Sequence, residues 1–174
     1  MTDRDWALTS LYHTVINCRD LDESVGFYRR LGFEVLDDRR GVEWPQFVAE
    51  LFGLERAQGR GVLMVLPSDP DGPMLDLIEW VTPTAAFPDP AASARTVPRI
   101  IAFRCRNLRQ ARAELAAAGV PFVSQMHEPG EALGVLGSIC ARDPNGNLVE
   151  LIELAPGVRH SRANQALAAE AHGR

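Results

Sequence analysis

The sequence contains the same pattern twice. Residues 69–79 read DPDGPMLDLIE, and residues 143–153 read DPNGNLVELIE. Each begins with a turn signal of Asp, Pro and Gly and continues as an apolar strand pattern that contains acidic residues. An internal repeat of this kind predicts two copies of one supersecondary unit, which bury their apolar surface together.

The beginnings of the two copies also match. Residues 13–21 read HTVINCRDL and residues 100–108 read IIAFRCRNL, and a helical pattern ending at Gly32 or Gly119 follows each. The matching front parts lie 87 positions apart and the back parts 74, so the first copy carries 13 additional residues. Most of this excess falls in residues 44–54, where WPQFVAELFGL predicts a short helix.

Each copy follows the order strand, helix, strand, strand, strand. The first predicts a strand at 10–18, a helix at 22–31 and strands at 33–36, 61–66 and 74–81; the second predicts a strand at 99–106, a helix at 108–118 and strands at 120–126, 134–142 and 147–154. One helix covers only one face of a four-stranded sheet, so two units can curve their uncovered faces around a shared cavity. The expected fold class is therefore α+β, with two tandem βαβββ modules forming a curved cleft.

Four segments are expected along the chain. They are a first module at 8–82, a Pro-rich linker at 83–98, a second module at 99–155 and a C-terminal tail at 156–174. The linker is inferred from its composition, because four prolines alternate there with Ala and Ser.

Composition excludes several classes of protein. With 46% hydrophobic and 24% charged residues, the 174-residue chain is ordinary for a soluble globular protein. A net charge of −5 without a Lys/Arg stripe argues against nucleic-acid binding. The sequence shows neither a membrane-spanning apolar run nor a signal-peptide pattern, so we expect a cytoplasmic protein. The three cysteines form no CxxC motif, and Cys18 and Cys105, which are equivalent in the two copies, are expected to be small buried residues in matched strands.

An acidic residue stands at the same place in the last strand of each copy. Asp76 lies in MLDLI and Glu150 in LVELI, where an ionised carboxylate is costly unless it is paired or bound to a metal. The alternative is a polar residue that faces solvent, but its recurrence in both copies favours the cleft. Side chains alternate along a strand, so Glu79 and Glu153 should point the other way. A slip in register would make Glu79 a substitute ligand.

These stretches resemble a known family. HTVINCRDLDESVGFYRRLGFEV in the first copy and DPNGNLVELIEL in the second resemble the vicinal oxygen chelate superfamily, which includes glyoxalase I, methylmalonyl-CoA epimerase, extradiol dioxygenases and the fosfomycin- and bleomycin-resistance proteins. The resemblance covers residues 10–154. It implies paired βαβββ modules, a small-molecule substrate or ligand, and a homodimer. The fold hosts many chemistries, so it does not name the activity.

The resemblance also implies a set of metal ligands. Metal-using members commonly take one ligand from the first strand and one from the last strand of each module, which here are His13, Asp76, Ile100 and Glu150. Isoleucine cannot bind a metal, so His13, Asp76 and Glu150 remain. Nitrogen and oxygen ligands with open positions suit Zn, Ni, Co, Mn or Fe(II). A single His on an apolar strand is alternatively a hydrogen-bonded core residue.

The resemblance implies two alternative functions. The first is a glyoxalase-like, metal-dependent lyase, isomerase or epimerase acting on a small oxygen-rich substrate, with Asp76 or Glu150 as the catalytic carboxylate that moves a proton. The second is a metal-free small-molecule binding protein of the bleomycin-resistance type, which Ile100 favours. Ile100 also counts against an extradiol dioxygenase, because those members use two His and a Glu.

Four further residues are candidates for contacting a substrate: Arg104, His127, Trp44 and Trp80. Arg104 has the strand parity of Ile100, so it would reach the cleft and hold a carboxylate or phosphate. His127 follows a strand end and would contact the ligand or exchange a proton. For both, the alternative is exposure to solvent. The segment 44–54 is a natural lid, or alternatively packs in the core or at a dimer interface.

Overall fold

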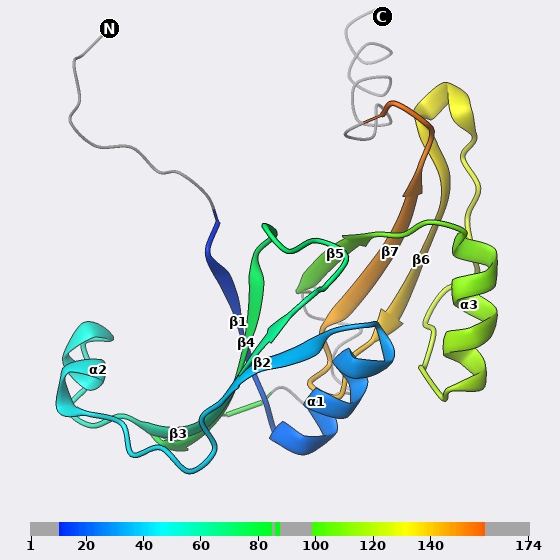
Figure 1. The fold of residues 1–174 in the computed structure, drawn as a ribbon. Coiled ribbons are helices and arrows are strands. Elements are labelled where there is room, and N and C mark those ends of the chain that lie inside the picture. The colour runs from blue at the N-terminus through cyan, green and yellow to red at the C-terminus, as the bar shows by residue number, and fades with distance from the viewer. Residues whose placement is uncertain (1–10, 85, 88–98, 159–174) are drawn as a thin grey trace, which may run out of the picture. The chain divides into compact units, whose positions relative to one another are not determined.

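The computed structural model describes residues 11–84, 86–87 and 99–158 (Figure 1). The elements are β1 (His13–Asn17), α1 (Leu21–Arg30), β2 (Glu34–Asp38), α2 (Gln46–Leu51), β3 (Gln58–Val65), β4 (Met74–Thr82), β5 (Ile100–Arg104), α3 (Leu108–Ala117), a 3₁₀ helix at Glu131–Leu133, β6 (Val135–Arg142) and β7 (Leu148–Leu154). They belong to two compact units, residues 1–87 and 88–174. The predicted linker at 83–98 and tail at 156–174 lie mostly outside the described residues.

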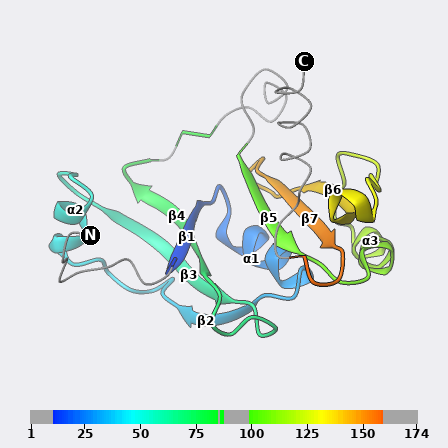
Figure 2. The ribbon, with the colours of Figure 1, turned by 90° about the horizontal axis from the view of Figure 1, so that it is seen from above.

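The first unit is a four-stranded sheet with one long helix. The strand order is β1-β4-β3-β2, with β1 parallel to β4 and the other pairs antiparallel. Helix α1 packs against β3 and β4 and lies along one face of the sheet (Figure 2). We call this the helix face, and the opposite face the open face. The predicted strands and helix of the first copy are present, with ends shifted by a few residues.

The core of the first unit lies between α1 and its sheet. The buried residues of the helix include Leu21, Val25, Phe27 and Tyr28, and those of the sheet include Val62, Met64, Leu75 and Leu77. Burial of each large apolar side chain contributes about 1.5–3 kcal/mol. Val62, Met64, Leu75 and Leu77 share one strand parity, so the predicted period of two places this apolar row beneath the helix, whereas Asp76 and Ile78 are buried on the opposite face.

Helix α1 has clear signals at both ends. The side chain of Asp20 accepts a hydrogen bond from the Glu23 N–H at 2.8 Å, as an N-cap does. Acidic residues occupy the first turn and basic residues the last, which suits the helix dipole. Gly32 ends the helix with φ of +95°, a backbone conformation that glycine adopts without strain.

The second unit repeats this plan with one strand fewer. Its sheet has the order β5-β7-β6, with β5 parallel and β6 antiparallel to β7, and α3 lies along one face (Figure 2). The strand predicted at 120–126 does not form; isolated bridges join Phe122 to Ala141 and His127 to Ser138 instead. Pro121 has no N–H to donate, which helps to explain why this segment meets β6 only at separate points.

The two units share one register, as the repeat predicts. Val15 of β1 is the partner of Asp76 on β4, and Ala102 of β5 is the partner of Glu150 on β7. The α+β class with two equivalent modules is therefore confirmed, with the second strand of the second module reduced to isolated bridges. The three cysteines are free thiols; Cys18 is buried as expected, whereas Cys105 is only half-buried. Among the described residues, no helix is long and apolar enough to cross a membrane.

Candidate functional site

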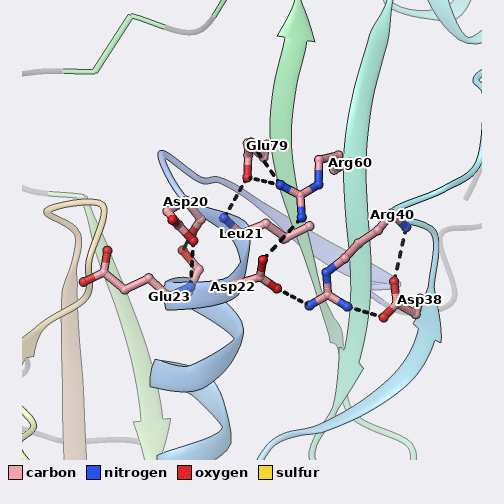
Figure 3. A network of polar contacts seen from close by, with 9 residues as sticks. Asp20, Leu21, Asp22, Glu23, Asp38, Arg40, Arg60 and Glu79 are labelled. Carbon is pink, nitrogen blue, oxygen red and sulfur yellow. Dashed lines mark hydrogen bonds and ion pairs between the residues drawn. The ribbon is translucent and has the colours of Figure 1, made fainter.

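The glutamates at the end of the last strands lie on the helix faces. Glu79 accepts a hydrogen bond from the Leu21 N–H, at the first residue of α1, with a distance of 2.9 Å. Arg60 lies 3.4 Å from the same carboxylate and also pairs with Asp22, as Figure 3 shows. Glu79 therefore holds the start of the helix. It has the strand parity opposite to Asp76, and it is not placed to be the substitute ligand.

Glu153 has the equivalent role in the second unit. Its two carboxylate oxygens accept the N–H groups of Asn107 and Leu108 at 2.9 and 3.0 Å, at the start of α3. Asn107 has φ of +55° and gives no side-chain cap, so Glu153 supplies the acceptor instead. Burial, and secondarily the Glu153 carboxylate, raise the pKa of the Cys105 thiol. Both units thus use an equivalent glutamate, Glu79 or Glu153, to accept hydrogen bonds at the start of the equivalent helix.

Asp76 lies on the open face of the first unit and is paired with an arginine. Its side chain is only 9% exposed, and the Arg39 Nη2 lies 2.5 Å from its Oδ1. The Arg39 N–H donates to the Gly61 carbonyl at 2.9 Å, and a Cβ added to Gly61 would lie 3.6 Å from Nη2. The guanidinium thus lies against β3 over Gly61, at a distance where an added Cβ would be in ordinary contact with it. Arg39 was not among the residues predicted from the sequence.

Within the first unit, the surroundings of Asp76 do not favour a divalent metal. Arg39 already neutralises Asp76, and a metal ion in the same place would meet the repulsion of the guanidinium. His13 is on the same face by parity, but its strand partner is Met74, two residues before Asp76. Within the part of the chain that the structure describes, no group of three or more His, Cys, Asp and Glu side chains is arranged to hold a metal.

Aromatic side chains gather beside Arg39 on the same open face. The Trp44 and Trp80 rings are 5.2 Å apart and edge-on, and Phe52 lies 5.9 Å from Trp80. Trp44 packs over Gly59, where an added Cβ would come within 2.9 Å of the indole. Trp80 Nε1 donates to the Asn17 Oδ1 at 2.9 Å. The structure therefore brings together the two tryptophans predicted to contact a ligand.

The inserted helix α2 stands at the end of this aromatic group. Figure 1 shows it beside the end of β3 that begins at Gln58. The Trp44 N–H donates to the Gln58 Oε1 at 3.0 Å, which ties the insert to the strand. Phe47 and Leu51 point outward and are exposed, whereas Ala49 is buried. The insert thus contributes Trp44 to the open face and leaves an apolar surface on α2 itself.

The open face of the second unit carries Glu150 among small polar side chains. The Ser138 hydroxyl donates to the Glu150 Oε1 at 2.7 Å. Cys140 is the strand partner of Glu150, and its N–H donates to the Ser124 hydroxyl at 3.1 Å. Burial, and secondarily the Glu150 carboxylate, raise the pKa of the Cys140 thiol. Glu150 is half-buried, so its carboxylate remains within reach of solvent.

The remaining predicted residues of the second unit are exposed. Ile100, at the position of the missing ligand, is 55% exposed. Arg104 is exposed and has the strand parity of Ala102, the partner of Glu150. His127 is exposed and is bridged to Ser138, which places it beside the same face at the edge of the sheet. The structure thus brings Glu150, Arg104 and His127 to one sheet, on the face that carries Ser138.

A missed signal for the first unit was visible in the sequence. Residues 58–62 read QGRGV at the start of β3, of which only the part from Gly61 was predicted, and glycine within a strand often marks a close approach of other chain segments. Gly59 and Gly61 have the same parity, so both fall on the open face. They receive Trp44 and Arg39, respectively.

Comparison with known proteins agrees with this arrangement. Two modules with equivalent registers, each with an acidic residue on the open face of its last strand, define a paired-module glyoxalase-type fold. The model of the Glyoxalase/Bleomycin resistance protein/Dioxygenase superfamily matches residues 10–151. The chain belongs to this superfamily.

Individual relatives are distant. The glyoxalase domain-containing protein RDO1 of Mycosarcoma maydis is 26% identical over 149 residues, which cover 85% of this chain and 70% of RDO1. Among solved structures, a glyoxalase family protein from Bacillus cereus is similar with a TM-score of 0.68 and 18% identity, covering 88% of this chain and 98% of that one.

Two further solved structures, of a fosfomycin resistance protein and of a glyoxalase I, are also similar in fold. A mutant of the fosfomycin resistance protein FosX from Listeria monocytogenes, complexed with Mn(II) and 1S,2S-dihydroxypropylphosphonic acid, is similar with a TM-score of 0.58 and 15% identity, covering 86% of this chain and 95% of that one. Leishmania major glyoxalase I is similar with a TM-score of 0.55 and 20% identity, covering 95% of each chain. At these identities the likeness shows the fold alone.

Proposed function

We propose that this chain is a small-molecule-binding member of its superfamily that works without a metal ion at Asp76. The observation that carries the proposal is the ion pair between Arg39 and Asp76. Breaking a buried ion pair by removing one partner costs about 3–5 kcal/mol, and the partial exposure of Arg39 lowers that figure. A metal that bound Asp76 would have to offset the loss of this pair. Ile100 gives it no compensating ligand.

The open face of the first unit supports a binding role. Ligand sites are usually lined by apolar and aromatic side chains with a few polar groups that fix orientation. Here Trp44 and Trp80 are half-buried and Phe52 is exposed, and Arg39 supplies the polar group. This composition suits a small organic ligand that combines a flat apolar part with a polar group.

A metal-dependent lyase, isomerase or epimerase acting on a small oxygen-rich substrate is the second candidate. It is favoured by membership of a superfamily with metal-containing relatives, one of which carries Mn(II). It is also favoured by the half-buried Glu150, which lies at the strand position that corresponds to Asp76. Zn, Ni, Co, Mn or Fe is the metal to be tested.

Metal analysis separates the two candidates. Untagged protein is dialysed against Mn, Ni, Co and Zn in turn, then against buffer, and its metal content is measured by mass spectrometry. The proposal predicts no retained stoichiometric metal in the wild type. Stoichiometric metal that is lost in both Asp76→Asn and Glu150→Gln would refute the proposal and support the second candidate. The Glu153→Gln variant is the control, because Glu153 holds a helix on the other face.

We also propose a homodimer, which is common among relatives of this fold. Exposed apolar side chains support it, including Tyr12, Leu36 and Leu51. Sedimentation equilibrium tests it, and a monomer at micromolar concentration would contradict it. The cytoplasmic location, the absence of a nucleic-acid partner and the proposed module boundaries of 8–82 and 99–155 stay predictions.

A further inference from the structure

We infer that Arg39 binds the carboxylate of a planar aromatic ligand, and that Asp76 is the positioning residue that holds Arg39 in place. The inference rests on the proposed function and narrows it to a chemical class of ligand. It assigns Asp76 an indirect role, since its carboxylate would act on the ligand only through the guanidinium.

The first argument is the orientation of Arg39. The residue follows β2, and its backbone is fixed to β3 by the hydrogen bond to Gly61. Its side chain is 35% exposed while that of Asp76 is 9% exposed, so the carboxylate is the inner partner and the guanidinium reaches the surface. Nε lies 3.5 Å from the Asp37 Oδ2. Among the described residues Nε has no hydrogen-bond partner, so the conformation is set mainly by the Asp76 ion pair and the backbone hydrogen bond to Gly61.

The Arg39 guanidinium has N–H donors that its ion pairs do not use. Arginine carries five N–H donors in a planar fork that matches a carboxylate. Among the described residues, the ion pairs of Arg39 use Nη2 and Nε. The Nη1 edge therefore has its donors left for the oxygens of a ligand. A group that is held before the ligand arrives loses little conformational entropy on binding.

The second argument is the position of the aromatic side chains. On β4 the open face carries Trp80, Ile78 and Asp76 in succession. Trp80 is the strand partner of Gly59 and Ile78 is the partner of Gly61. Because Trp44 packs over Gly59 and Arg39 over Gly61, the indole and the guanidinium stand two strand positions apart, about 7 Å.

An aromatic acid matches this spacing. Its ring would contact the aromatic group while its carboxylate reached the guanidinium next to it. Phe52 is 50% exposed, so it offers apolar surface that a bound ring would remove from water. Asn17, which accepts the Trp80 N–H, fixes the edge of this surface.

The charge balance has to be weighed, because two carboxylates surround one guanidinium. The charge of Asp76 is buried and directly neutralised by Arg39. Asp37 has a side chain that is 57% exposed and a longer contact, so water and salt screen it. The charge that a ligand meets at close range is then that of Arg39. If Asp37 dominated instead, the site would prefer a cation.

Three probes of one shape test the inference. They are 2-naphthoate, its neutral amide and the cationic 2-naphthylmethylamine, each titrated into the full-length protein by calorimetry. We expect the carboxylate to bind at least about tenfold more tightly than the amide, because the charge-assisted pair is lost in the amide. The amine should bind more weakly than the amide.

Variants assign the effect to the residues. Arg39→Gln should reduce the affinity for naphthoate to the level of the affinity for the amide. The affinity for the amide itself should not change. Arg39→Lys keeps the charge without the planar fork and should recover part of the loss. Asp76→Asn should weaken the binding of naphthoate although Arg39 remains. This variant tests the role of Asp76 in positioning Arg39. Arg60→Gln is the matched control, since it removes an arginine from the helix face of the same sheet and should change neither affinity.

The outcomes separate this inference from the proposed function. Equal binding of naphthoate and amide, unaffected by Arg39→Gln but lost in Trp80→Ala, would overturn the inference and leave the binding role standing. Tightest binding of the amine would overturn the inference in favour of a cation site. Failure of all three probes would overturn the inference, and retention of metal at Asp76 would overturn the proposed function. Circular dichroism of each variant checks that the fold is kept.

Discussion

Replacing Gly59 with alanine should destabilise the first unit, whereas the same change at Gly61 should not. An added Cβ at position 59 would lie 2.9 Å from the Glu79 carbonyl oxygen and 2.9 Å from the Trp44 ring. The carbonyl belongs to the backbone of β4, so the conflict cannot be relieved by a side-chain rotation alone. At position 61 the nearest atom would be the Arg39 Nη2 at 3.6 Å, which is ordinary contact.

The size of the effect follows from two opposing contributions. Overpacking in a filled site costs about 1–3 kcal/mol. Glycine to alanine, where the backbone is compatible, gains about 0.4–1 kcal/mol by restricting the unfolded chain. We expect Gly59→Ala to lose about 1–2 kcal/mol net of these two figures. Gly61→Ala should be neutral or slightly stabilising.

Urea unfolding followed by tryptophan fluorescence measures both variants. The midpoint should fall for Gly59→Ala and stay or rise for Gly61→Ala, with unchanged slopes. The fluorescence of folded Gly59→Ala should also change, because Trp44 has to move. Equal midpoints for the two variants, or a higher midpoint for Gly59→Ala, would refute the close packing of Trp44 and β4 at this glycine.

Three further predictions concern the charged groups. Asp76→Asn should lower the free energy of unfolding by about 1–3 kcal/mol because it leaves Arg39 without its charged partner, and a denaturation midpoint equal to wild type would contradict this. Glu153→Gln should cost about 0.5–2 kcal/mol because it weakens the acceptor at the start of α3, as thermal unfolding would show; an unchanged melting temperature counts against that role. Glu150→Gln should speed alkylation of Cys140 by iodoacetamide at pH 8, because the carboxylate raises the pKa of that thiol and its removal favours the reactive thiolate; a slower or unchanged rate would show that access controls the reaction.

Much of the fold could be predicted because the repeat and the apolar periodicity act locally. The alternation in residues 74–81 places Leu75 and Leu77 beneath α1, and the same alternation separates Asp76 from Glu79. The strand predicted at 120–126 does not form. The apolar pattern of a sequence does not show whether an edge segment finds continuous hydrogen-bonding partners on the neighbouring strand. The backbone of this segment reaches β6 through isolated bridges at Phe122 and His127 and not through a continuous ladder.

The site was predicted less completely, because its main contact joins residues distant in sequence. Arg39 stands in a charged run, DDRR, that by itself is typical of an exposed turn. Its partner Asp76 is 37 residues away, and only the folded sheet brings them together. Gly59 and Gly61 were the available signal, because two glycines of equal parity in a strand indicate that something packs closely against one face.

The pairing of Arg39 with Asp76 is the central claim, and a crystal structure of the untagged protein soaked in MnCl₂ or ZnCl₂ tests it most directly. We expect electron density for the Arg39 guanidinium in contact with the Asp76 carboxylate, and no anomalous peak within coordination distance of that carboxylate. An anomalous peak bound to Asp76, with Arg39 turned away from it, would contradict the account.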